Sequence, residues 1–311
     1  MDIHIAYWVN EEYTKYAYIS CYSLLKNIKN KNNVICHLIS EANNQYKKYF
    51  YDLENEFNFF KFQFHTIDDK SLKNIPTSLP HLNSSAFYRL EVDKIIKSTE
   101  KIIYLDADTI IVWDISELYK QDLEEKIIGA MADSPEGLDN KRIKEYWLKN
   151  NKYFNSWVML INLKKWKQFQ IWDKVLSLLK ERKYPNDDQD PLNIVLQDSV
   201  KYLDWKYNVT TSSFMINDDT KFKGFWKDYY LDAKRNPTLI HFTWSVKPWN
   251  LFCIHPYTTI YLNYLLKLWK FGGIIYKTKL IFTYIFQRII FILFPSFQFR
   301  QKISSSLHKI L

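Results

Sequence analysis

Short apolar runs alternate with helical patterns along most of this 311-residue chain, and this alternation constrains the fold more than any other feature. Helical patterns lie between the first two runs, at 14–28, and before the fourth, at 84–96. Alternation of this kind predicts an α/β fold with a mostly parallel sheet and flanking helices. Six runs have the length and the residue types of β-strands: residues 3–9, 34–40, 60–67, 101–105, 126–132 and 237–243.

Length, composition and cysteine content indicate a folded protein from a reducing compartment. With 47% hydrophobic residues, the chain can bury one large core or two smaller ones, and neither disorder nor a collagen-like fibre fits. Cys21, Cys36 and Cys253 lie far apart without a CxxC pair, so neither a disulfide framework nor a zinc knuckle is indicated. The N-terminal MDIHIAYWV has an acid in place of a basic segment, so we expect no secretory signal and a cytoplasmic location.

The net charge of +9 belongs to one end of the chain. Residues 233–311 contain no Asp or Glu and carry 11 of the 43 Lys and Arg residues, which leaves residues 1–232 with a net charge of −2. A near-neutral body with a basic end does not indicate a nucleic-acid-binding protein. We therefore expect no nucleic-acid partner, and RNA binding by the basic end is the weakest alternative.

The basic end is also aromatic and aliphatic, as in KLIFTYIFQRIIFILFPSFQFRQK at 279–302. Gln287 and Arg288 interrupt its apolar run, which falls short of the roughly 20 residues that a membrane-spanning helix needs. A basic amphipathic segment at the surface of an anionic membrane fits this pattern, and a C-terminal helix packed on the core is the alternative. We expect a folded domain at 1–255 and a membrane-associating tail at 256–311, with the protein peripheral at the inner face of the cytoplasmic membrane.

Two carboxylates, Asp106 and Asp108, interrupt the apolar stretch KIIYLDADTIIVWD. Burying an ionised carboxylate costs several kcal/mol unless it is paired or binds a metal. In extended backbone the two side chains would face the same side at the end of a strand, where they could hold Mg²⁺ or Mn²⁺ bridged to a substrate phosphate. The chain has no GxGxxG and no GxxxxGK[ST], so metal and side chains would have to hold a diphosphate. An acid that caps a turn is the alternative, because a lone DxD pair is common.

Six motifs follow one another in the chain: IAYWVNEEY, SSAFYRLEV, YLDADTII, YFNSWVMLINLKKW, DDQDPLN and HFTWSVKPW. In this order they resemble the motifs of the retaining glycosyltransferases of family 8, which include bacterial lipopolysaccharide and lipooligosaccharide galactosyl- and glucosyltransferases. The resemblance covers roughly residues 1–255 and implies a GT-A fold, in which a Rossmann-like sheet binds the nucleotide, together with a nucleotide-sugar donor and Mn²⁺.

The resemblance implies that Asp106, Asp108 and His241 bind the metal. An imidazole beside two carboxylates favours Mn²⁺, with Mg²⁺ as the alternative. Lys247 resembles the lysine that contacts the donor diphosphate, where its charge would stabilise the departing nucleotide. Without the resemblance, His241 would be interpreted as a core histidine and Lys247 as a surface lysine.

The same resemblance implies a larger set of donor-binding residues. Gln189 corresponds to the residue near the anomeric carbon, and Asp188 lies beside it; the alternative for residues 186–188 is a helix N-cap. Arg89 would touch the donor phosphate or sugar, and otherwise would be a solvent-exposed helical arginine. The implied donor-binding set is Ala6, Tyr7, Asn10, Arg89, Asp106, Ala107, Asp108, Asp133, Asn155, His241 and Lys247, and the implied catalytic set is Gln189, Asp188 and Lys247.

The chain departs from the family pattern near the base and the sugar. Trp8 and Val9 replace the acid usual in the first motif. Trp157 and Trp244 stand where the family usually has small residues, so the resemblance does not identify the hexose.

The expected reaction moves galactose or glucose from a UDP-sugar to a lipopolysaccharide or lipooligosaccharide acceptor, with retention at the anomeric carbon. We expect this saccharide acceptor to be lipid-linked. Gln189 is a poor nucleophile, which favours same-face attack assisted by the leaving phosphate over double displacement. LDADT also fits the DxDx[TV] motif of haloacid-dehalogenase-like phosphatases, in which Asp106 would be the nucleophile and Asp108 the general acid. A noncatalytic protein that binds a sugar nucleotide or a membrane surface is the third hypothesis.

Overall fold

The computed structural model describes residues 1–29, 32–67, 90–133, 141–149, 152–214, 225–243, 246–251, 253 and 255–293. In this part of the chain a seven-stranded sheet has the order β3-β2-β1-β4-β7-β6-β8, and a three-stranded sheet has the order β5-β10-β9. The strands are β1 Asp2–Trp8, β2 Asn33–Ser40, β3 Phe60–Thr66, β4 Lys101–Leu105, β5 Thr109–Ile111, β6 Ile128–Ala132, β7 Phe154–Asn162, β8 Val200–Tyr202, β9 Val209–Thr210 and β10 Leu239–His241.

The α-helices are α1 Glu11–Asn27, α2 Lys48–Glu56, α3 Val92–Ile95, α4 Ser116–Lys120, α5 Lys141–Glu145, α6 Leu163–Gln168, α7 Ile171–Glu181, α8 Gln189–Leu196, α9 Phe225–Arg235, α10 Thr258–Leu265 and α11 Gly273–Leu293. Shorter 3₁₀ turns lie at Gln45–Lys47, Trp205–Tyr207, Thr211–Phe214 and Leu266–Phe271.

The predicted α/β fold with a mostly parallel sheet is confirmed. Strands β3, β2, β1 and β4 run parallel, whereas β7 is antiparallel to both of its neighbours, β4 and β6. Alternate residues of β1 divide between two hydrophobic cores: Ile3 and Ile5 join one core with α1, and Ala6 joins the other with α6 and α7. Burial on both faces explains why β1 and β4 are apolar runs without clear alternation, whereas β3, at the edge of the sheet, alternates in FKFQFHT.

Some predicted boundaries were wrong. The strand predicted at 237–243 is only three residues long and pairs with β5 in the small sheet. The strand predicted at 126–132 begins at Ile128, because Asp122 to Lys126 form a turn against the end of the sheet. Residues 84–89 of the helix predicted at 84–96 lie outside the described residues, and the described part, 90–96, contains the short helix α3.

Three histidines on neighbouring strands form a hydrogen-bonded row. His4 Nδ1 lies 2.9 Å from His37 Nε2, and His37 Nδ1 lies 3.0 Å from His65 Nε2. Burial, followed by the charges of His65 and His4, lowers the pKa of His37 from 6.5 to about 3. The row is therefore neutral at physiological pH and contributes hydrogen bonds between β1, β2 and β3.

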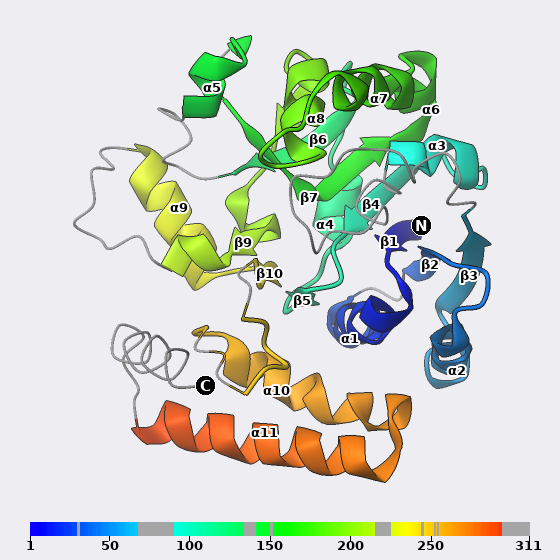
Figure 1. Ribbon diagram of the computed structural model, residues 1–311, viewed down its shortest axis with the longest axis vertical. Helices are drawn as coiled ribbons and strands as arrows, with labels where there is room; N and C mark the ends of the chain where they lie inside the picture. The colour runs from blue at the N-terminus through cyan, green and yellow to red at the C-terminus, as the bar shows by residue number, and fades with distance from the viewer. Residues whose placement is uncertain are drawn as a thin grey trace.

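Helices α10 and α11 lie along one side of the molecule, next to α1 and the small sheet (Figure 1). Tyr261, Leu262 and Leu265 of α10 are fully buried in the same core as Ile3 and α1. Among the described helices, none combines the length and the hydropathy needed to cross a bilayer.

Candidate metal and donor site

Asp106, Ala107 and Asp108 form the turn that connects β4 to β5. The Asp106 amide donates to the Trp157 carbonyl at 3.1 Å, and the Asp108 carbonyl accepts from the Phe242 amide at 3.0 Å. The prediction of extended backbone between the two acids was wrong, since strand β4 ends at Leu105. The turn nevertheless brings both carboxylates to the end of a buried strand.

His241 reaches this turn because β10 pairs antiparallel with β5, with His241 opposite Thr109. Ligand atoms of Asp106, Asp108 and His241 all lie within 4.8 Å of one another. His241 Nε2 is 2.9 Å from Asp108 Oδ1. Two carboxylates and an imidazole are a donor set suited to Mn²⁺. His241 lies 135 positions after Asp106 in the sequence, and the pairing of β5 with β10 in the small sheet brings the three side chains together.

The neighbours of His241 determine which ring nitrogen faces the acids. The Trp157 amide donates to Asn155 Oδ1 at 3.0 Å, so that atom is an acceptor and takes its second hydrogen bond from Asn208 Nδ2 at 2.8 Å. Asn208 Oδ1 therefore faces His241 Nδ1, 3.0 Å away, and accepts a hydrogen bond from it. The second nitrogen, Nε2, then points at Asp108 Oδ1. Two acceptors 2.9 Å apart need a proton or a metal ion between them, so the residues present fit a cation.

A positive side chain balances Asp108. Lys247 Nζ is 2.6 Å from Asp108 Oδ2 and donates to the Phe242 carbonyl at 2.7 Å. Burial alone would raise the pKa of Asp108, but Lys247 and His241 outweigh it and hold that pKa well below its usual range. Asp108 thus remains an anion, as a metal ligand must.

A line of polar side chains leads from the candidate metal site, formed by Asp106, Asp108 and His241, toward the predicted sugar site. Asn155 Nδ2 donates to Asp133 Oδ1 at 2.7 Å. A chain of hydrogen bonds therefore runs from His241 through Asn208 and Asn155 to Asp133. Burial raises the pKa of Asp133, although the hydrogen bond from Asn155 opposes this.

Gln189 is buried at the start of α8. Its Oε1 accepts from the Ser156 amide at 2.9 Å, and its Nε2 donates to the Tyr153 hydroxyl at 3.3 Å. Asp188 occupies the N-cap position of α8, but its side chain makes no capping hydrogen bond. Asp187, just before it, has a φ of 35° in the left-handed region. The side chain of Gln189 is thus held against the start of β7.

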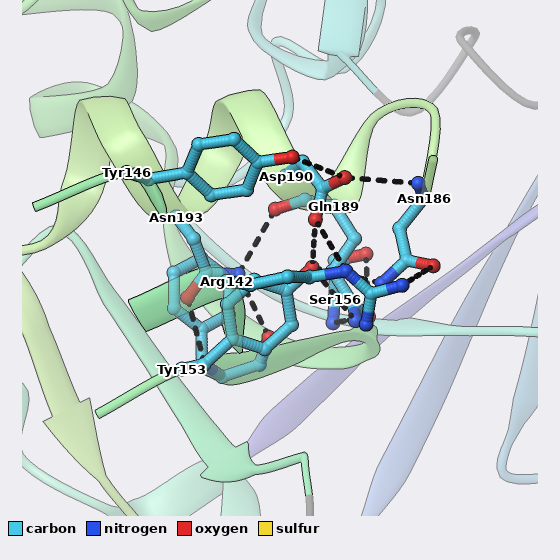
Figure 2. Close-up of polar contacts among 9 residues, drawn as sticks. Arg142, Tyr146, Tyr153, Ser156, Asn186, Gln189, Asp190 and Asn193 are labelled. Atoms are coloured by element: carbon cyan, nitrogen blue, oxygen red, sulfur yellow. Dashed lines mark hydrogen bonds and ion pairs between the residues drawn. The ribbon is translucent and has the colours of Figure 1, made fainter. Parts of the chain in front are cut away.

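Asp190 anchors this segment to the rest of the molecule. Tyr146 and Tyr153 donate to its carboxylate at 3.1 and 2.5 Å, and the Asn186 amide donates at 2.9 Å. Arg142 Nε lies 3.6 Å from the same carboxylate, and these side chains converge on it in Figure 2. The network fixes the turn that carries Asp188 and Gln189.

The predicted nucleoside contacts lie at the end of β1. Tyr7 is fully buried and its hydroxyl bonds to Ser20 at 2.9 Å, so only its backbone could contact a ligand. Ala6 is also fully buried, and Asn10 caps α1 by accepting from the Tyr13 amide at 2.9 Å. Arg89 and Trp244 lie outside the described residues.

Sequence reasoning missed two neighbours of the metal cluster. Tyr104 donates from its hydroxyl to Asp106 Oδ1, and Asn208 orients His241. Tyr104 precedes Asp106 by two positions in the apolar run, which is a weak sequence signal for such a contact. Asn208 stands in no motif.

Comparison with known proteins gives a family and a fold. The profile described as "Glycosyl transferase family 8" matches residues 4–253. General stress protein A of Bacillus subtilis (strain 168) is 31% identical over 194 residues, which cover 60% of this chain and 66% of that protein. A lipopolysaccharide 1,2-glucosyltransferase of Escherichia coli is 28% identical over 257 residues, covering 79% of this chain and 73% of that protein.

The solved structure of galactosyltransferase LgtC in complex with donor and acceptor sugar analogs superposes with a TM-score of 0.70 at 21% identity. The match covers 85% of this chain and 95% of LgtC. At this identity the likeness establishes the GT-A fold alone.

Proposed function

The chain belongs to glycosyl transferase family 8, and on that premise we propose that it transfers galactose or glucose from a UDP-sugar to a lipopolysaccharide or lipooligosaccharide acceptor, with retention. It is a glycosyltransferase with a candidate divalent-metal site. The names of its relatives support the hexose and the acceptor class. Nothing in the family match supports the phosphatase hypothesis.

Asp106, Asp108 and His241 would hold the metal, with Mn²⁺ as the proposed ion and Mg²⁺ as the alternative. A bound metal would supply positive charge to the diphosphate leaving group. The Lys247 ammonium group contacts the Asp108 carboxylate. A metal ion bound at that carboxylate would take the place of the ammonium group and free the lysine to contact the diphosphate. The juxtaposition of Lys247 with the metal cluster is the observation that carries this proposal.

Donor recognition by the remaining residues stays a proposal. Asp133 and Asn155 offer a carboxyl and an amide for sugar hydroxyls, and an unpaired buried polar group is costly enough to reject an epimer. Asp188 and Gln189 would lie near the anomeric carbon, with the network of Asp190 keeping their turn in place. Ala6, Tyr7, Asn10, Ala107 and Arg89 complete the proposed donor site.

Release of UDP tests the proposed reaction. The protein is incubated with UDP-galactose, UDP-glucose and UDP-N-acetylglucosamine, with and without Mn²⁺, and compared with Asp108→Asn. Metal-dependent release from one hexose donor, lost in a variant that still folds, is expected. Release that is equal with and without metal, or phosphatase activity trapped as an acyl phosphate on Asp106, would refute the proposal.

We also propose that the segment 256–311 associates with an anionic membrane, while 1–255 carries the catalytic site. Successive residues of a helix are rotated by about 100°, so the buried side chains Leu280, Thr283 and Gln287 define the inner face of α11. The outer face, opposite to it, exposes Phe282, Ile285, Ile289 and Ile292.

Charge along α11 suits a lipid surface. The exposed Lys277 lies on one flank of the outer face and the exposed Lys279 on the other, as the same rotation shows. Arg288 lies on the flank of Lys277, where its guanidinium donates to Asn263 of α10 at 2.9 Å. No acid occurs after residue 232. An apolar face between basic flanks matches an interfacial helix on anionic lipid, which would bring the active site to a lipid-linked acceptor at the inner face of the cytoplasmic membrane.

Vesicle flotation tests this surface. The Phe282→Glu, Ile285→Glu variant should lose binding to vesicles rich in phosphatidylglycerol, whereas Trp147→Glu, at an exposed tryptophan on the α5 side of the molecule, should retain it. Undiminished binding by the first variant would contradict the proposal.

A further inference from the structure

Gln287 is a buried polar residue in the most apolar helix of the described chain. Its side chain is 1% exposed on the inner face of α11. Its Nε2 donates to the Pro248 carbonyl at 3.3 Å and also to the Asn250 carbonyl. Both partners belong to the turn that directly follows Lys247.

That turn is held from two sides. On one side, the Trp249 ring stacks on Tyr16 of α1, with ring centroids 3.5 Å apart and planes 8° apart. On the other side, Gln287 donates to the carbonyls of Pro248 and Asn250. Within the turn, the Asn250 amide donates to the Lys247 carbonyl at 2.9 Å, and the Cys253 amide donates to the Asn250 carbonyl at 3.2 Å.

We propose that Gln287 is a positioning residue for Lys247: by holding the carbonyls of Pro248 and Asn250, it keeps the ammonium group within reach of Asp108 and of the donor diphosphate. This inference rests on the proposed function of Lys247. It gives α11 a role in the reaction that is separate from its outer face.

The chemistry at this position requires a donor. A carbonyl oxygen only accepts, so two carbonyls at one side chain need an N–H₂ group. Methionine has nearly the volume of glutamine and no donor, and it favours helix, so Gln287→Met removes the hydrogen bonds with little change in packing. Thr283→Val is the matched control, because Thr283 is buried on the same face one turn earlier.

The first measurement is amide hydrogen exchange in the protein without nucleotide. The Asn250 and Cys253 amides should exchange about tenfold faster in Gln287→Met than in the wild type, which corresponds to about 1.4 kcal/mol. Thr283→Val should leave them unchanged. Equal exchange in Gln287→Met and the wild type would overturn the inference without reference to any ligand.

The second measurement is calorimetric binding of UDP and of uridine in the presence of Mn²⁺. Gln287→Met should weaken UDP binding about tenfold and leave uridine binding unchanged, because only UDP carries the diphosphate. In a Lys247→Met background the same substitution should have no further effect on UDP. An equal loss of affinity for UDP and for uridine would show a merely structural role and overturn the inference. So would a further tenfold loss of UDP affinity when Gln287→Met is added to Lys247→Met.

Failure of the proposed function appears differently. In that case the wild type itself binds no UDP with Mn²⁺. The role at the diphosphate then falls with it, while the exchange rates still decide whether Gln287 holds the turn.

Discussion

Asn208 should control metal affinity although it is not a ligand. It is 3% exposed, accepts from His241 Nδ1 and donates to Asn155 Oδ1. Asn208→Leu removes the acceptor, so the His241 ring loses the contact that directs Nε2 toward Asp108, and a buried N–H is left unpaired. An unpaired buried group costs about 1–3 kcal/mol.

The expected result is Mn²⁺ affinity reduced about 10- to 100-fold, as for other groups that orient a metal-binding histidine. This corresponds to about 1.4–2.7 kcal/mol. Free Mn²⁺ counted by electron paramagnetic resonance during a titration at fixed pH measures it directly. Asn208→Asp is the matched control: its carboxylate still accepts from Nδ1, so affinity should stay within about threefold of the wild type.

Two outcomes would refute the reasoning. Binding of Mn²⁺ by Asn208→Leu as tight as that by the wild type would mean that the hydrogen bond does not orient His241. Equal large losses in Asn208→Leu and Asn208→Asp would mean that the donor side of Asn208, toward Asn155, matters in place of the acceptor side.

Three further predictions concern protons, charge and metal. The folded protein protonates His37 only near pH 3, whereas the unfolded chain does so near pH 6.5, so acidification through this window favours unfolding. Stability should fall by about 2 kcal/mol from this group between pH 7 and pH 5, and urea unfolding should show a smaller fall in His37→Phe. Lys247→Met should bind Mn²⁺ alone more tightly, on the order of tenfold, because the ammonium group no longer repels the cation. The same variant should bind UDP in the presence of Mn²⁺ more weakly, and calorimetry that finds weaker binding of both Mn²⁺ and UDP would contradict this prediction. Saturating Mn²⁺ should raise the melting temperature of the wild type by about 5 °C and that of Asp106→Asn far less, and equal rises in a thermal scan would count against the site.

The sequence predicted those parts of the site whose signal is local. Asp106 and Asp108 stand out because two charges follow an apolar strand, and that contrast is visible within a few positions. The α/β fold was predictable for the same reason, since strands such as β1 and β4 are short apolar runs. Strand β7 was not predicted, although its sequence FNSWVMLIN is apolar. It is buried on both faces, so its sequence does not alternate, and periodicity alone does not distinguish a short apolar run from a buried helix.

Contacts between distant elements left no such signal. His241 lies 133 positions after Asp108, and only the pairing of β10 with β5 brings them together, so His241 needed the family resemblance. Gln287 was interpreted as a break in an apolar run. Its two carbonyl partners lie 37 and 39 positions earlier, and nothing near Gln287 in the sequence indicates them.

The two faces of α11 determine how a shortened form of this protein would behave. Deleting α11, the last helix that the structure describes, would remove Leu280 from the core and Gln287 from the 248–250 turn along with the outer apolar face. A loss of activity in such a shortened protein would therefore not report on the outer face. Exchanging outer-face isoleucines for glutamate, with the helix left in place, changes the outer face and leaves both inner contacts intact.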